Sequence, residues 1–82
     1  MAKYQCPCCN CLTLDEPPGE GSYDICSVCY WEDDPVQFKD ENYAGGANHV
    51  SLKEARENYR LIGASEERVR HLVRPLTADE LP

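Results

Sequence analysis

The chain has 82 residues, a formal net charge of −7 and only 15 leucine, isoleucine, valine and phenylalanine residues, so it can form one small domain with a limited apolar core. Residues 1–50 carry nine acids and two bases, a balance of 2 − 9 = −7, whereas residues 51–82 carry six of each. Such an acidic surface repels phosphate and argues against nucleic-acid binding, and no apolar run has the length of a membrane span or a signal peptide. We therefore expect a cytoplasmic protein. Its apolar core alone would not supply enough stability for folding, so a further source of stability is needed.

Two cysteine pairs near the start of the chain predict a metal site. Cys6 and Cys9 form one C-x-x-C motif, Cys26 and Cys29 form a second, and sixteen residues separate them. This spacing is typical of zinc sites, because each motif places two sulfurs on one side of a tight turn and two facing turns complete a tetrahedron. We predict one structural zinc ion bound by these four thiolates, with iron as the less favoured metal. A framework of three disulfides would instead require an exported protein.

The segments between the two motifs predict a β-hairpin. Leu12–Leu14 and residues 22–25 are short strand-like runs on either side of residues 15–21, which are rich in turn-forming side chains. If these runs paired, their open end would carry both cysteine turns, as in a zinc ribbon. Asn10, after the first motif, tolerates the left-handed conformation that such a turn needs, whereas Tyr30, after the second, suits it less well.

An aromatic and acidic run follows the second motif. We expect Trp31 to cover the metal site or to fill the small core. Glu32, Asp33 and Asp34 could bind a hard cation or a basic partner, or they could cap a turn and pair with arginines of the second half, Arg56 among them. The alternating oxygen ligands of a calcium loop are absent from this run.

The second half of the chain is predicted to be helical. Ser51 and Glu54 form a capping box, and an apolar face at helical spacing leads to a natural stop at Gly63. We predict a second helix from Ser65 to Pro75. The expected fold is therefore α+β, a small zinc-ribbon-like β-hairpin followed by two short helices. Residues 1–76 would form a single cysteine-rich metal-binding domain, and residues 77–82 a flexible tail.

Other chemistry is sparse in this sequence. Cys8 and Cys11 could be reactive thiols, alternative metal ligands or buried small apolar residues. His49 could replace one of the cysteine ligands, although a surface or capping role suits it better. No nucleophile is accompanied by a base, so we do not expect an enzyme.

Several longer motifs resemble the bacterial cysteine-rich CPCC family. They are CPCC at residues 6–9, LTLDEPPG at residues 12–19, WEDDPVQ at residues 31–37 and YAGGAN at residues 43–48, and EARENY and GAS extend the likeness to roughly residues 4–75. The resemblance implies a small bacterial metal-binding domain without an established biochemical role. Some family members carry the name hydrolase, but no group of residues here supports that activity.

The chain departs from the family at the cysteines themselves. Family members usually have glycine and an aromatic residue where this chain has Asn10 and Cys11, and proline where it has Ser27. The comparison implies that Cys11 lies outside a shared metal site, whereas Cys8 remains a candidate ligand beside Cys6, Cys9, Cys26 and Cys29.

The function that these features favour is a protein–protein interaction module. Trp31, Glu32, Asp33 and Asp34 would offer an acidic, aromatic-edged surface to a protein with a basic face, as an adaptor, antitoxin-like or inhibitor protein would. A rubredoxin-like iron electron carrier is the alternative, and a thiol-dependent enzyme or hydrolase acting through Cys8 or Cys11 comes third.

Overall fold

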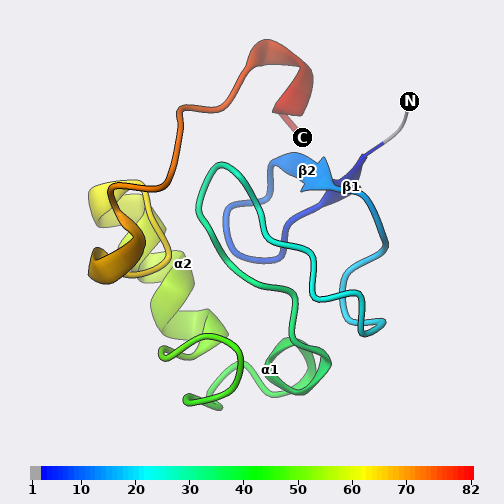
Figure 1. The fold of residues 1–82 in the computed structure, drawn as a ribbon, viewed down its shortest axis with the longest axis vertical. Helices are drawn as coiled ribbons and strands as arrows, with labels where there is room; N and C mark the ends of the chain where they lie inside the picture. Colours follow the sequence, from blue (N-terminus) through cyan, green and yellow to red (C-terminus); the bar gives the residue numbers. More distant parts are fainter. Residues whose placement is uncertain (1–2) are drawn as a thin grey trace.

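Two cysteine turns form the centre around which the rest of the chain is wound. The computed structural model describes residues 3–82. Figure 1 shows the helices to one side of the first cysteine turn and the C-terminal segment running from them back toward the strands. The elements in chain order are β1 (Tyr4–Gln5), β2 (Leu12–Leu14), α1 (Pro35–Lys39), α2 (Leu52–Ile62) and the short 3-10 helices η1 (Glu67–Val69) and η2 (Ala78–Glu80). A two-stranded antiparallel hairpin with two α-helices confirms the predicted α+β, zinc-ribbon-like fold.

The strand pairing differs from the predicted one. β2 pairs with β1, with Tyr4 opposite Leu14 and Gln5 opposite Leu12, and not with residues 22–25. Ile25 forms a single bridge with Glu32 on the far side of the second cysteine turn. Each turn is therefore closed by its own flanking residues: the amide of Cys6 donates to the carbonyl of Cys11 at 2.9 Å, and the amide of Cys26 donates to that of Trp31 at 3.0 Å.

Helix α2 begins and ends where the sequence predicted, but of the reciprocal capping box expected from Ser51 and Glu54 only the hydrogen bond to the serine forms among the described residues. The Ser51 hydroxyl accepts a hydrogen bond from the Glu54 amide at 3.1 Å, and Gly63 ends the helix in the left-handed conformation with φ 76°. Leu52 and Ala55 are fully buried, and Tyr59 packs against the same core. The amphipathic face of this helix therefore closes one side of the cysteine-rich centre.

The predicted second helix is wrong. Only η1 and the turn after it form there, because the residues meant to begin the helix are used elsewhere. The Ser65 amide donates to the carbonyl of Cys29 at 2.8 Å, and the Glu66 carboxylate accepts from the amide of His49 at 3.1 Å. This segment is thereby fastened to the second cysteine turn. The domain boundary at residue 76 and the flexible tail remain predictions; within that tail, η2 contacts β2.

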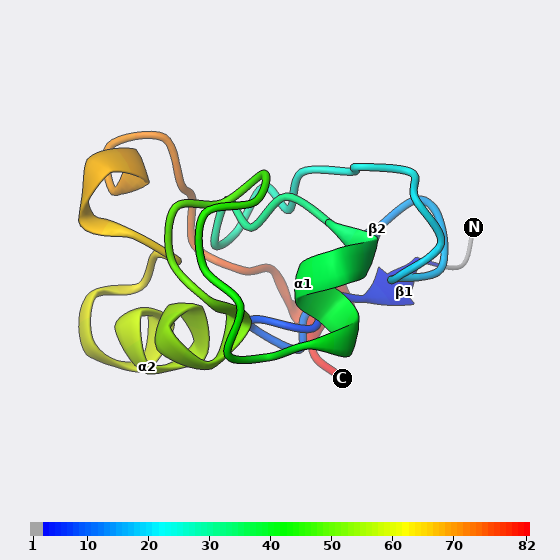
Figure 2. The same cartoon turned by 90° about the horizontal axis from the view of Figure 1, so that it is seen from below.

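Helix α1 forms in a segment for which no helix was predicted. The Asp34 carboxylate accepts from the amides of Val36 at 2.8 Å and Gln37 at 3.3 Å, and Pro35 occupies the first turn, where its missing N–H does no harm. In Figure 2, which looks from below, the helix stands in front of the hairpin, and Figure 1 shows the two well apart. The helix instead contacts the loop that precedes the second cysteine turn, where the Phe38 ring lies against Gly19. Among residues 3–82, no helix is long and apolar enough to cross a membrane.

A buried amide network connects α1 to the glycine-rich loop after it. Gln37 is fully buried, and its Nε2 donates to the carbonyls of Tyr43, Asn48 and Val50 at 3.0, 3.2 and 3.0 Å. Its Oε1 accepts from the backbone and side-chain nitrogens of Asn48 at 3.1 and 2.9 Å. Gly46 lies tight against this network, since a Cβ there would meet Gln37 Cδ at 3.0 Å. The Gln37 side chain thus fastens the loop from residue 43 to residue 50 at three of its carbonyls and at Asn48.

Gln37→Glu should therefore destabilise the protein strongly. The substitution would place a carboxylate oxygen among three carbonyl oxygens and remove the donors that satisfy them, at a cost of ~3 kcal/mol or more. Urea unfolding of the metal-loaded protein measures the loss. Gln5→Glu makes the same chemical change on an exposed strand and should leave the free energy of unfolding nearly unchanged. Equal effects of the two substitutions would show that the network contributes little.

Candidate metal centre

The two cysteine turns have the same backbone structure. The amide of Asn10 donates to the carbonyl of Cys6 at 2.8 Å, and the amide of Tyr30 donates to that of Cys26 at 2.7 Å. Asn10 and Tyr30 both take the left-handed conformation, with φ 67° and 68°. Tyr30 was expected to suit this conformation less well, which would have made the two turns differ. That expectation of a difference is wrong, because the geometry of the turn overrides the side-chain preference.

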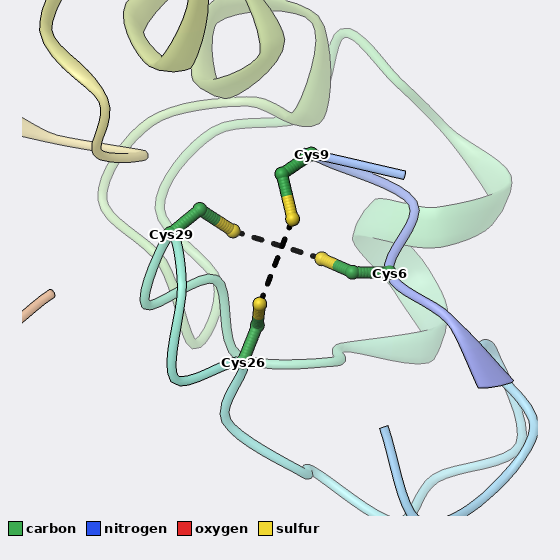
Figure 3. A group of neighbouring side chains, drawn as sticks. All are labelled: Cys6, Cys9, Cys26 and Cys29. Atoms are coloured by element: carbon green, nitrogen blue, oxygen red, sulfur yellow. Dashed lines mark hydrogen bonds between the residues drawn. The ribbon is translucent and has the colours of Figure 1, made fainter. Parts of the chain in front are cut away.

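The four predicted ligands converge on one point. The Sγ atoms of Cys6, Cys9, Cys26 and Cys29 all lie within 4.8 Å of one another. Cys6 and Cys29 are 3.6 Å apart, as are Cys9 and Cys26, and both contacts join one turn to the other (Figure 3). Sulfurs bound tetrahedrally to zinc at ~2.3 Å would be ~3.8 Å apart. The arrangement could therefore hold a metal ion with little movement.

The sulfurs lie too close together to ionise independently. Hydrogen bonds from Cys29 and the other thiols, and from Thr13, lower the pKa of Cys26. The pKa values of Cys6, Cys9 and Cys29 rise, first because each thiol holds its proton in a hydrogen bond to Cys26. Four thiolates at this spacing would repel one another strongly, and a divalent cation between them would remove that repulsion.

Cys8 and Cys11 lie outside this group of sulfurs. The matching backbones of the two turns make Cys8 equivalent to Val28 and Cys11 equivalent to Trp31. All four positions are buried, with at most 4% of the side chain exposed. Of the roles left open for these two cysteines, the structure favours that of small apolar core residues.

His49 is not a replacement ligand. Its side chain is 70% exposed, and its Nδ1 lies 3.7 Å from a carboxylate oxygen of Glu66. Its exposed position agrees with the surface role that the sequence favoured for it.

The predicted acidic partner surface is corrected by the structure. Trp31 and Asp33 are fully buried and Asp34 is 6% exposed, so these side chains cannot form an exposed binding surface. Asp33 accepts from the amide of Gly19 at 2.9 and 3.0 Å, while Asp34 caps α1 and accepts from the amide of Ala47 at 2.9 Å. These backbone donors satisfy the carboxylates, and the N-cap at Asp34 agrees with the capping role that was the alternative to a cation or partner site. Glu32 alone is partly exposed.

Arg56 contacts a different part of the chain from the one predicted. Its Nε donates to the carbonyl of Pro7 at 2.8 Å, and its guanidinium pairs with Glu41 at 2.7 Å. The arginine therefore ties α2 to the first cysteine turn and not to Glu32, Asp33 or Asp34. Nothing in the helical pattern around Arg56 indicated a carbonyl 49 positions earlier in the sequence.

Together these features define a class: a small α+β domain with a four-cysteine centre that could bind a metal ion. A comparison with family models matches residues 4–80 to the family described as Cysteine-rich CPCC, so the chain belongs to that family. A search of curated proteins found no match.

The cysteine assignment makes a direct prediction about metal uptake. Cys26→Ser should abolish binding of one metal ion, because it removes a sulfur at the centre of the group. The double substitution Cys8→Ala, Cys11→Ala should retain one ion and lose ~2–3 kcal/mol or less of stability from the smaller core. Native mass spectrometry gives the stoichiometry of each variant. Loss of the ion in the double variant would mean that Cys8 or Cys11 is a ligand.

Proposed function

We propose that this protein is a structural-zinc module that binds a protein with a basic surface, as an adaptor, antitoxin-like or inhibitor protein does. The observation that carries the proposal is the closed set of four sulfurs at Cys6, Cys9, Cys26 and Cys29. A catalytic zinc keeps one coordination position for water or substrate, whereas four thiolates fill a tetrahedron. The proposal therefore assigns the metal to folding and assigns no enzymatic role.

Zinc is the metal proposed for this centre. Four thiolates also hold iron in electron-transfer proteins, but zinc requires no redox function and suits a reducing compartment such as the cytoplasm. A colourless protein with one zinc ion, which unfolds when a chelator removes the ion, would support the assignment. A red protein containing iron would replace it with electron transfer.

The acidic surface proposed here is carried by other residues than those first predicted. The five arginines are each paired with an acid of the same chain, through Glu41, Glu57, Glu66, Glu67 and Glu80. Glu16, Glu20 and Asp40 are exposed and have no ion-pair partner among residues 3–82. Lys39 is the only lysine or arginine between residues 4 and 52. The first half of the chain thus keeps an unbalanced negative charge.

An exposed aromatic side chain accompanies these acids. Phe38 on α1 is 37% exposed, and its ring lies directly against Gly19, where an added Cβ would overlap it. Glu20 follows Gly19, and Asp40 follows α1, so both acids lie close to the ring along the chain. We name Glu20, Phe38 and Asp40 the Phe38 patch. Aromatic residues are enriched where proteins bind one another, and the neighbouring acids favour a basic partner.

The Phe38 patch can be tested by charge reversal. Proteins captured from a lysate with the wild type should include basic ones that are lost with Glu20→Lys, Asp40→Lys. They should be retained with Asp79→Lys, which changes an exposed acid outside the patch. Quantitative mass spectrometry of the captured proteins measures the difference. Recovery of the same partners by every variant, or of acidic partners only, would contradict the proposal.

A further inference from the structure

An irregularity in the small hairpin changes the direction of one side chain. Tyr4 faces Leu14 and Gln5 faces Leu12, so two residues of β1 lie opposite three of β2, and Thr13 has no residue opposite it. An extra residue of this kind bends the strand and redirects its side chains, and such bulges are frequent beside functional sites. Leu14, the next residue, is fully buried in the core.

The Thr13 side chain reaches the second cysteine turn. Its Oγ1 donates a hydrogen bond to Cys26 Sγ at 2.9 Å. Within residues 3–82, this hydroxyl is the only oxygen or nitrogen donor hydrogen-bonded to one of the four sulfurs. This hydrogen bond runs from β2, which flanks the first cysteine turn, to a sulfur atom of the second cysteine turn. It therefore links the strand register to the position of one ligand.

A donor at this position has a definite electrostatic effect. Four thiolates around one divalent ion leave a net charge of −4 + 2 = −2 at the centre. A hydroxyl that donates to a thiolate withdraws part of this excess charge and fixes the direction of the sulfur lone pairs. Both effects favour retention of the metal.

We propose that Thr13 is a positioning residue of the metal centre, and that the bulge in β2 directs its hydroxyl toward the Cys26 sulfur. The inference rests on the proposed metal-binding function. Loss of a hydrogen-bonding partner of a metal ligand typically weakens metal affinity 10–100-fold, so we expect a loss of about tenfold without the hydroxyl.

Two substitutions separate the hydroxyl from the shape of the side chain. Thr13→Val keeps the branched shape and the strand preference but has no donor, whereas Thr13→Ser keeps the donor. Zinc affinity, measured by competition with a chromogenic chelator, should fall about tenfold in Thr13→Val and recover in Thr13→Ser. In the cobalt-substituted protein, the sulfur-to-cobalt charge-transfer band of Thr13→Val should move to lower energy, because an unbonded thiolate is a better electron donor.

The possible results have distinct meanings. Affinity and band energy equal to wild type in Thr13→Val would overturn the role of Thr13 while leaving the metal centre intact. Equal weakening in Thr13→Val and Thr13→Ser would show that packing, and not the hydroxyl, is responsible, and would overturn it too. A wild-type protein that takes up neither zinc nor cobalt would remove the proposed metal function together with this inference.

Discussion

The fold depends on bringing four sulfur atoms to one point. Cys6, Cys9, Cys26 and Cys29 come from two turns, and the pairs in closest contact each join one turn to the other. Thiols at this distance compete for protons, and thiolates at this distance repel, so the close approach is favourable when a cation lies between them. Half of the ten buried core residues are cysteines, and the large apolar side chains among the others are Leu14, Trp31 and Leu52. A domain of this size and composition gains little stability from apolar burial alone.

The sequence predicted those parts of the structure that depend on residues close together in the chain. The C-x-x-C spacing predicted which sulfurs meet, and the serine and glycine that bound α2 predicted both of its ends. The hairpin partner was mispredicted because the sequence does not show whether a strand pairs across a turn or across a loop. The second predicted helix failed because Ser65 and Glu66 form hydrogen bonds to residues far away in the chain.

The acidic run after the second turn shows a different limit. Aspartates are usually exposed, so a row of acids beside a tryptophan predicted a surface. In the structure Asp33 and Asp34 are buried because amides from distant loops, those of Gly19 and Ala47, satisfy their carboxylates. The same holds for Gln37 and Asn48, which organise the glycine-rich loop from within. A polar motif can therefore be specific because it is internal, and its length alone does not reveal a binding surface.

The positions of the four sulfurs along the chain also bear on how the protein is made. All of them lie between Cys6 and Cys29, whereas the segments that support them, α2 and the residues that bind the second turn, come later. During synthesis the four ligands therefore leave the ribosome before Arg56 and Ser65 do. A metal ion captured at that stage would act as the template on which the remaining residues assemble. The supply of metal during synthesis would then decide how much of the protein reaches the native state.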